Sequence, residues 1–582
     1  MASENDIQQF VHNLEEGSWV GWIKFVAFLV FTLAVASAYF FWDFVGLSNP
    51  RAMEQAQIAR SVASGQGFAT NELRPAALAQ IQHKRGDFPD GTVPDTYHAP
   101  LHSLVLAPFL LLTKKDWKMT MNDLIYVNDR MIVVVDMACF ILSVGVIFLL
   151  LRRLFDVRLA TMGCMMLVLC DRLWQFSTSG LPQMLMLLLF SIAVYLLARA
   201  IEAQELGERP LAWLVACAVA FGLLGLTHAM TFFIFGACVL FVALYFRPWW
   251  LAPILMVAIV GGMYLPWMIR NYHVCGYPLG IAYLSILDGI RGSEDSIMRG
   301  FTGDYTGIQP YFFRYKLMYG LITQMGSIYT LLGAIVAAPF FLAALLYRFR
   351  RRETDIFKWA VLVMWIGAVF GMCLYNMNMK DVSSIPSQAI DANDLHVLFI
   401  PLFVAFGLAL LLVLWSRLEV NLNYARLCFL ALLFIVSAMP IVGRAFGSPK
   451  NKVAWPPYVP PYITLLRDWS NSDDIIVSDM PWAVGWYANR KCLWLPSKMT
   501  DVITLHDYDQ LHAPIIGIYL TPITGDLPLF KGILRGEYSD WAPLILRSNN
   551  FRDFPFNAVA PMPIDNECVF YADHDRWTRT SD

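Results

Sequence analysis

The sequence predicts a polytopic α-helical membrane protein of about eleven transmembrane helices, followed by a small soluble α/β domain. Two features of the composition support this prediction. Asp, Glu, Lys and Arg make up only 15% of the 582 residues, and hydrophobic residues make up 57%. Soluble proteins carry roughly 25% charged residues, so there is too little polar surface to cover a water-soluble globule of this size. The net charge of −2 also excludes a broadly cationic nucleic-acid-binding protein.

Apolar runs of about membrane-spanning length recur through the first three quarters of the chain. A bilayer core of about 30 Å requires about 20 apolar residues in a helix. The predicted spans are 22–42, 131–151, 159–170, 181–198, 211–227, 229–246, 250–269, 326–347, 359–376, 395–415 and 427–443. The run at 159–170 is short for a span, and we expect the stretch at 101–112 to lie at the membrane interface.

The distribution of Lys and Arg between the short loops predicts the orientation of the chain in the membrane. With the N-terminus in the cytoplasm, the cytoplasmic connections contain Arg152, Arg153, Arg158, Arg199, Arg209, Arg247, Arg348, Arg350, Arg351, Arg352, Lys358, Arg417 and Arg426. The short connections on the opposite side contain only Arg172 and Lys380. We therefore expect a multi-pass protein of the bacterial inner membrane, with a cytoplasmic N-terminus and an extracytoplasmic C-terminus.

This orientation divides the chain into a membrane domain and an exported domain. The membrane domain spans residues 1–445, with exterior loops at about 43–128 and about 270–325, and the α/β domain spans 446–582. Alternating strand-like and helical patterns predict a mostly parallel sheet in the exported domain: strands at Ile475–Ser478, Cys492–Leu495 and Ile515–Leu520, and helices at Trp482–Ala488 and Asp501–Leu511. Cys492 and Cys568 lie in this domain, and whether they form a disulfide is left open.

Four short motifs lie in order along the membrane domain. The first is Gln57-Ile58-Ala59-Arg60 with Gly65-Gln66-Gly67-Phe68, at the end of an expected exterior helix, and the second is His98-Ala99-Pro100-Leu101. The third is Ser179-Gly180-Leu181-Pro182-Gln183, and the fourth is Pro266-Trp267-Met268-Ile269-Arg270-Asn271. In this order the motifs resemble those of GT-C superfamily glycosyltransferases, in the branch related to protein O-mannosyltransferases and lipid A aminoarabinose transferase.

The resemblance implies a GT-C-like membrane domain and an inverting transfer of a hexose or pentose. The donor would be a polyprenyl-phosphate-linked sugar, and the acceptor a lipid, glycan or protein on the extracytoplasmic face. Two positions depart from the family pattern. Relatives often carry Asp-Glu nine residues before the arginine of the first motif, where this chain has Arg51-Ala52, and often have an acid at the position of Gln183. The resemblance therefore assigns no catalytic base.

The chemistry of such a transfer requires a carboxylate near the acceptor and cations near the lipid phosphate, all at the membrane interface. Glu54 is the first candidate for the base, Asp43 the second and Asp95 the third. The alternative for Glu54 is a solvated acid on an exterior helix, paired with a neighbouring arginine. Asp43 could equally be a charge at the end of a span, and Asp95 the start of a turn.

Arg270 is the first candidate for the phosphate-binding cation, because its planar guanidinium matches phosphate oxygens and it follows the interfacial Trp267. The other candidates for binding the lipid phosphate or the sugar are Asn271, His98, His102, Arg60, Asp171 and Gln183. Each has a structural alternative: a snorkelling arginine, a packed histidine or a helix cap. No clustered ligand set requires a metal, so no cofactor is assigned and a divalent cation stays an open alternative.

Two other classes of protein remain alternatives. A transporter or flippase of lipid-linked glycans is also polytopic, but it predicts charged residues near the middle of the membrane, where Asp136 is the clear exception among otherwise apolar spans. A non-catalytic protein on the same scaffold is favoured by the missing Asp-Glu pair. Besides donor and acceptor, the expected partners are membrane lipids, and no nucleic acid is expected.

Overall fold

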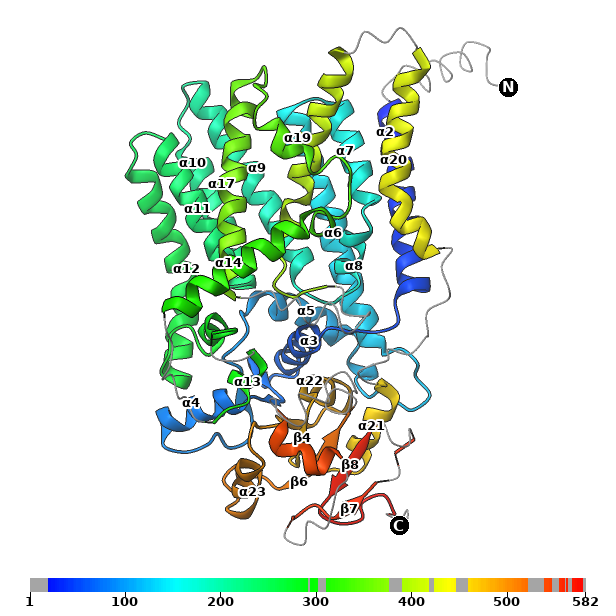
Figure 1. Cartoon of the computed structure of the whole chain (residues 1–582), viewed down its shortest axis with the longest axis vertical. Helices are drawn as coiled ribbons and strands as arrows, with labels where there is room; N and C mark the ends of the chain where they lie inside the picture. Colours follow the sequence, from blue (N-terminus) through cyan, green and yellow to red (C-terminus); the bar gives the residue numbers. More distant parts are fainter. Residues whose placement is uncertain are drawn as a thin grey trace, which may run out of the picture.

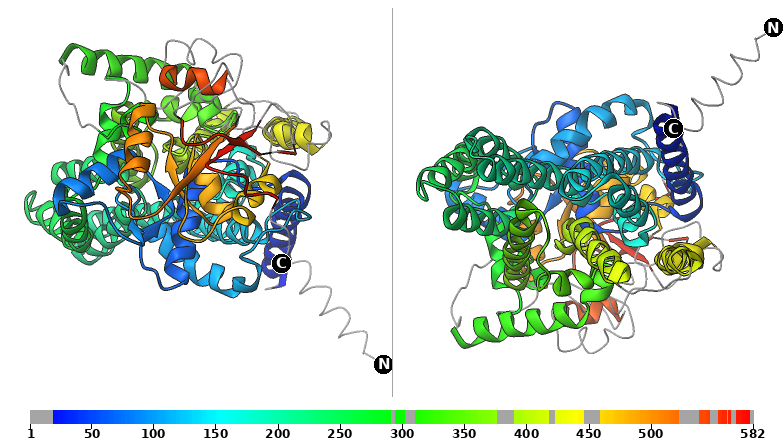
Figure 2. Two further views of the ribbon diagram at one scale, coloured as in Figure 1. Left: turned by 90° about the horizontal axis from the view of Figure 1, so that it is seen from below. Right: turned by 90° about the horizontal axis from the view of Figure 1, so that it is seen from above.

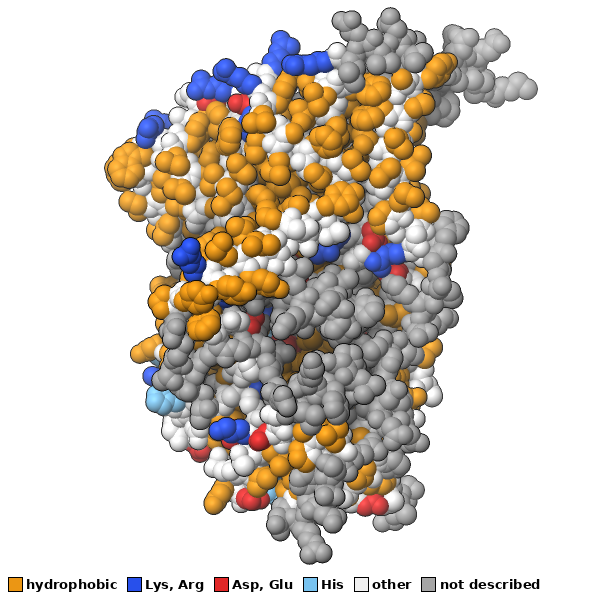
Figure 3. Space-filling view, in the orientation of Figure 1, with side chains coloured by type: hydrophobic (Ala, Val, Ile, Leu, Met, Phe, Trp, Pro, Cys, Tyr) orange, Lys and Arg blue, Asp and Glu red, His pale blue; other side chains and the backbone are white. Residues whose placement is uncertain are grey.

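The computed structural model describes residues 19–290, 294–301, 310–375, 390–417, 423–445, 459–521, 538–546, 554–560, 562–563 and 568–578. Long helices that run roughly side by side form one end of the molecule, and a sheet with short helices forms the other (Figure 1). A broad hydrophobic belt covers the long helices (Figure 3). Lys and Arg side chains gather at the end of these helices that is remote from the sheet (Figure 3).

Seven helices among the described residues are long and apolar enough to cross a membrane. They are α2 (Trp19–Ala38, continued by η1, Tyr39–Asp43), α6 (Val127–Leu154), α9 (Gln183–Glu205), α12 (Leu251–Cys275), α17 (Arg352–Tyr375), α19 (His396–Arg417) and α20 (Asn423–Ala445). Shorter apolar helices lie among them: α5 (Leu101–Leu112), α7 (Val157–Val168), α10 (Leu211–Thr227) and α11 (Thr231–Tyr245). In both end-on views α2 and α20 lie at the edge of the bundle (Figure 2).

The predicted span at 326–347 is not one continuous helix. The structure has two short helices there, α15 (Ile328–Leu331) and α16 (Phe340–Ala344). The helix cannot continue between them because Gly333 and Ala334 both adopt the left-handed conformation, with φ of 80° and 54°. The irregular segment packs against α19 at Gly407, where an added Cβ would lie 1.7 Å from the carbonyl oxygen of Ala337.

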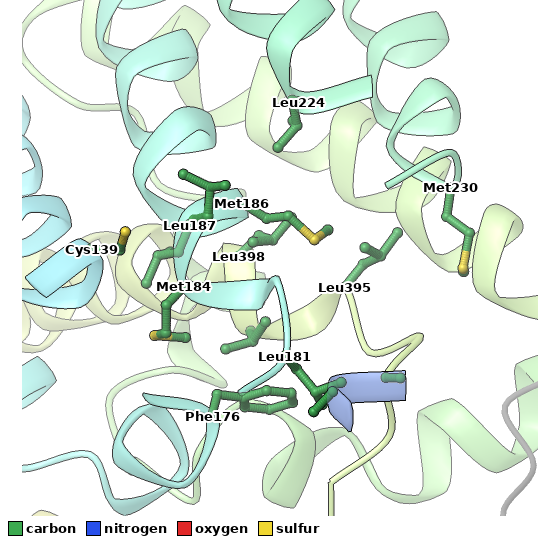
Figure 4. Close-up of a cluster of buried hydrophobic side chains, with 14 of the residues drawn as sticks. Cys139, Phe176, Leu181, Met184, Met186, Leu187, Leu224, Met230, Leu395 and Leu398 are labelled. Atoms are coloured by element: carbon green, nitrogen blue, oxygen red, sulfur yellow. The ribbon is translucent and has the colours of Figure 1, made fainter. Parts of the chain in front are cut away.

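Buried apolar side chains from several membrane helices form the core of the bundle. Figure 4 shows one cluster, built from Cys139 on α6, Met184, Met186 and Leu187 on α9, Leu224 on α10, and Leu395 and Leu398 at the start of α19. Phe176 and Leu181 enter the same cluster from α8 (Asp171–Ser177) and the turn before α9 (Figure 4). This packing holds α6, α9 and α19 together toward the end of the bundle that faces the sheet. The predicted orientation makes these the outer ends of the helices and the loops that rest on them the exterior loops, and both names are used in that sense below.

The first exterior loop folds into a compact layer between the membrane helices and the sheet. Its elements are α3 (Pro50–Ala63), β1 (Ala69–Thr70), β2 (Glu72–Leu73), α4 (Pro75–Arg85) and β3 (Val93–Pro94), followed by α5. The exterior helix expected from the first motif is confirmed as α3, which begins with Asn49 capping Arg51 N and Pro50 in the first turn. Because α5 and the C-terminal elements enclose it, α3 is buried over most of its length.

The second exterior loop contributes η3 (Ala282–Leu287), α13 (Glu294–Met298) and α14 (Pro310–Gly326). The C-terminal part contains α21 (Pro460–Asp468), α22 (Pro481–Ala483), η4 (Val484–Ala488), α23 (Met499–Asp507), η6 (Ser539–Trp541) and α26 (Ala542–Ile545). The predicted boundary at residue 446 lies outside the described residues, as does most of the Pro-rich stretch that follows it.

The C-terminal sheet confirms the predicted strands at β4 (Ile475–Ser478), β5 (Lys491–Trp494) and β6 (Ile515–Leu520). Its order is β2-β5-β4-β6-β8-β7. The strands β2, β5, β4 and β6 pair parallel, whereas β8 (Val569–Ala572) pairs antiparallel with both β6 and β7 (Ala558–Val559). The edge strand β2 comes from the first exterior loop, with Glu72 opposite Cys492. The sheet is therefore shared between the two predicted domains. Cys492 and Cys568 are both free thiols.

Candidate functional site

A cavity lies where the first exterior loop meets the outer ends of the membrane helices. Its walls come from α3, the segment before α5, the turn between α10 and α11, and the outer end of α12. The polar lining residues are Arg51, Gln55, Thr96, His98, Thr227, His228, Asn271, Ser285 and Asn393, and the aromatic ones are Tyr97, Tyr264, Trp267, Tyr283 and Tyr375. No Asp or Glu among the described residues lines it. The wall thus combines hydrogen-bond donors with aromatic faces.

His98 occupies the wall of this cavity between two carboxylates. Its Nε2 lies 2.8 Å from Oε2 of Glu54, an ion-pair distance without the alignment of a hydrogen bond. Its Nδ1 lies 3.4 Å from Oδ1 of Asp95, whose other oxygen accepts the backbone N–H groups of Tyr97 and His98. Burial lowers the pKa of His98, but the two carboxylates outweigh this effect and raise it above its ordinary value.

Arg74 forms ion pairs with the three carboxylates that lie behind His98. One guanidinium nitrogen lies 2.6 Å from Glu54 and 3.2 Å from Glu72, and another lies 3.9 Å from Asp95. Burial would raise the pKa of Glu54, but Arg74 and then His98 lower it below its ordinary value. Burial raises the pKa of Glu72 well above its ordinary value, since Arg74 does not compensate for the nearby Glu54 and Asp95. The surroundings of Glu54 and Asp95 lower the pKa of each and favour the charged carboxylate, whereas those of Glu72 favour its protonated form.

Arg270 attaches the outer end of α12 to this group. Its guanidinium donates hydrogen bonds to the backbone carbonyls of Asp95 and Phe68 and to Oδ1 of Asn271, and it lies 4.8 Å from the ring centroid of Trp267. The structure thus brings together five of the predicted residues: Glu54, Asp95, His98, Arg270 and Asn271. His98 and Asn271 line the cavity itself, whereas the other three lie behind its wall.

Asp43 and Asp171 belong to a different cluster. Nε of Arg444, on α20, lies 2.7 Å from Asp171, and its Nη1 lies 3.4 Å from Asp43. Tyr39 and Gln175 donate hydrogen bonds to the two oxygens of Asp171. These contacts link α2, α8 and α20 at the outer end of the bundle, and none of the residues lines the cavity.

Three further predicted residues make contacts away from the cavity surface. Arg60 donates to the carbonyls of Gly485 and Trp486 in η4, so it connects α3 to the C-terminal part, and burial lowers its pKa. Gln183 donates to the carbonyl of Ala392. His102 lies beneath the cavity, in contact with Gln55 through Nδ1.

Comparisons with known proteins agree on the architecture. The chain matches ArnT from Cupriavidus metallidurans bound to undecaprenyl phosphate with a TM-score of 0.51 and 13% identity, over 94% of this chain and 98% of that one. It matches the Archaeoglobus fulgidus oligosaccharyltransferase AglB, in complex with an inhibitory peptide and a dolichol-phosphate, with a TM-score of 0.53 and 12% identity, over 96% of this chain and 75% of that one. The chain has the GT-C fold.

The sequence comparisons cover less of this GT-C chain. A model of the dolichyl-phosphate-mannose-protein mannosyltransferase family matches residues 117–269, which run from before α6 to the last part of α12. No curated protein sequence matches the chain. The matched part contains α6, α9, α10 and α11 but ends one residue before Arg270, and it excludes the loop that carries Glu54, Asp95 and His98. The site must therefore be judged from its own geometry.

Several residues of the candidate site were not selected from the sequence. Arg74 has no motif around it, and only the folded loop brings it to Glu54. Arg51 was noted only as a departure from the family pattern, yet it lines the cavity and donates to Asn393. His228, in the turn after α10, and Tyr264, on α12, reach the same cavity from distant parts of the chain, which no local spacing could indicate. The described residues contain no group of three or more His, Cys, Asp or Glu arranged to hold a metal ion.

Proposed function

We propose that this protein transfers a sugar from a polyprenyl-phosphate donor to a lipid, glycan or protein acceptor on the extracytoplasmic side of a bacterial inner membrane. The observation that carries the proposal is the position of His98: it is held between Glu54 and Asp95 and faces a cavity at the outer ends of the membrane helices. A lipid phosphate can reach this depth without its charge entering hydrocarbon or its prenyl chain leaving it.

The two structural neighbours support the donor class. ArnT was solved with undecaprenyl phosphate, and AglB with dolichol-phosphate and a peptide. In this chain, the residues suited to the phosphate are Arg51 and Asn271 in the cavity wall, with Arg270 directly behind. The aromatic side chains Tyr97, Tyr264, Trp267 and Tyr375 offer apolar faces on which a sugar ring can stack.

His98 is the proposed catalytic residue. Its Nδ1–H faces Asp95, and Nε2, which makes no aligned hydrogen bond to Glu54, takes the proton of the acceptor as the bond to the sugar forms. The lipid phosphate leaves from the opposite face of the sugar, so the transfer inverts the anomeric configuration. Glu54, the first candidate for the base, acts through His98 in this proposal, because its carboxylate contacts Nε2 rather than the cavity. Together with Asp95 it stabilises the imidazolium that forms.

The experiment is turnover of a panel of polyprenyl-phosphate sugars by the full chain in lipid nanodiscs. We expect at least one donor to be consumed with release of polyprenyl phosphate, and we expect His98→Asn to lower turnover by about a hundredfold. His574→Asn, at an exposed position of the C-terminal part, is the matched control. Lipid translocation without cleavage would instead favour a flippase, and binding without either process would favour a non-catalytic scaffold.

A further inference from the structure

Gln55 presents one polar group to the cavity. Its side-chain Oε1 contacts Nδ1 of His102 at 2.5 Å, and its backbone carbonyl accepts a hydrogen bond from the hydroxyl of Ser103. The side-chain nitrogen Nε2 has no hydrogen-bond partner among the described residues, and Gln55 is part of the cavity wall. The amide therefore offers its N–H groups, which are donors only, to whatever occupies the cavity.

The orientation of this amide depends on a histidine within the layer below. An amide oxygen can only accept, so Nδ1 of His102 must carry the hydrogen in this contact. The other ring nitrogen, Nε2, lies 3.6 Å from Oδ1 of Asp136 on α6. Both ring nitrogens of His102 face oxygens, and only the imidazolium has an N–H for each. The Asp136 carboxylate stabilises this form, in which Nδ1 donates to Gln55.

Asp136 has no evident structural purpose. It is 1% exposed inside a membrane helix, and neither of its oxygens has a hydrogen-bond partner among the described residues. Of the titratable groups that face it, His102 comes from α5 and Cys139 from its own helix. A buried acid without hydrogen bonds is costly, so a residue of this kind in a membrane span usually has a function.

We propose that Gln55 is a substrate-contacting residue that donates hydrogen bonds to a phosphate oxygen of the lipid donor, and that His102 and Asp136 are positioning residues that keep its amide in the donating orientation. This inference rests on the proposed function and adds a contact that the Glu54–His98–Asp95 group does not supply. Without Asp136, neutral His102 can shift its proton to Nε2. Nδ1 would then accept, the Gln55 amide would rotate, and its oxygen would face the phosphate, which repels it.

The test measures binding of undecaprenyl phosphate to the full chain in nanodiscs, with the uncharged undecaprenol as the matched probe. We expect the wild type to prefer the phosphate, and Gln55→Leu to lose roughly tenfold of this preference, the typical effect of one hydrogen bond to a charged group. Asp136→Leu should cause the same loss. Asp136→Asn should retain the preference, because its amide can donate to Nε2 of His102 and preserve the donating Nδ1.

A double-mutant cycle separates positioning from a general structural effect. If Asp136 acts only through the amide, Gln55→Leu/Asp136→Leu binds the phosphate as weakly as either single variant, within about twofold. Additive losses, or wild-type preference in Asp136→Leu, would overturn the inference. If Asp136→Leu does not fold, two variants of His102 test the same point. His102→Asn keeps a donor near the position of Nδ1 and should retain the preference for the phosphate. His102→Leu has no donor there and should lose it. A wild type that does not distinguish the two probes would reject the proposed function itself.

Discussion

Nε2 of His98 lies 2.8 Å from Oε2 of Glu54, and the same carboxylate oxygen lies 2.6 Å from Arg74. One buried oxygen thus serves both the residue that faces the cavity and the cation that compensates the charge of the group. Glu54 is only 4% exposed, so no water can replace either partner without movement of the loop. The chemistry proposed for His98 and the stability of the first exterior loop therefore depend on the same atom.

The pH dependence of transfer should reflect the neutral form of His98. As the proposed base, His98 must be unprotonated, so kcat/KM should rise with pH through its pKa, which the two carboxylates raise above the ordinary value of about 6.5. Glu54→Gln removes one of these charges and should move the acidic limb of the profile to lower pH. Measuring kcat/KM across a pH series for the wild type and for Glu54→Gln gives the acidic limb of each profile. A profile that falls with rising pH across this range would instead assign His98 a role as a charged donor.

Removal of Arg74 should destabilise the protein strongly. Arg74→Met leaves Glu54 and Asp95 buried without their shared cation, and breaking a buried ion pair in this way typically costs about 3–5 kcal/mol. Thermal unfolding in detergent measures the loss. The double variant Arg74→Met/Glu54→Gln removes one of the uncompensated charges and should recover part of it. Equal stability of the single and double variants would mean that Arg74 stabilises by packing alone, for example over the ring of Tyr97.

Features that depend on neighbouring residues could be predicted from the sequence. Contacts between residues far apart in the chain could not. Helix periodicity located α3, and motif order placed His98 and Arg270 on the same side of the membrane. The contact of Arg270 with the carbonyl of Asp95 spans 175 positions, so no local pattern could indicate it. The edge strand β2 was missed for a related reason: two residues are too few for a recognisable alternation, and Glu72 pairs with β5 from the other end of the chain.

Asp43 and Glu54 were both candidates for the base, and the structure separates them clearly enough for a direct test. Asp43 lies in the cluster with Arg444, whereas Glu54 contacts His98. Asp43→Asn should leave kcat within about twofold of the wild type, and Glu54→Gln should lower it by about a hundredfold. Both variants keep the shape of the side chain, so the comparison isolates the charge. Loss of turnover in Asp43→Asn with normal turnover in Glu54→Gln would move the site to the Arg444 cluster.

Arg60 should matter for the contact between α3 and the C-terminal part rather than for chemistry. Its guanidinium donates to the carbonyls of Gly485 and Trp486 and lies 4.6 Å from the centroid of the Trp486 ring. Arg60→Met removes the side-chain donor to both carbonyls, which should cost about 1–3 kcal/mol. Hydrogen exchange should therefore accelerate in η4, with Arg85→Met on the exposed end of α4 as the control. Unchanged exchange would mean that other contacts hold η4.

Arg51 offers the sharpest test of where the phosphate binds. It stands where relatives often have an acid, and its guanidinium lines the cavity, 5.4 Å from the ring centroid of Tyr97. A hydrogen bond to a charged group contributes about 1.5–3 kcal/mol, so Arg51→Ala should raise the KM for the donor by roughly ten- to a hundredfold and change kcat little. Arg51→Lys keeps the charge but loses the planar fork, and it should recover only part of the affinity. A lower kcat with unchanged KM would instead place Arg51 at the transition state, and wild-type kinetics would place the phosphate elsewhere, nearest to Arg270.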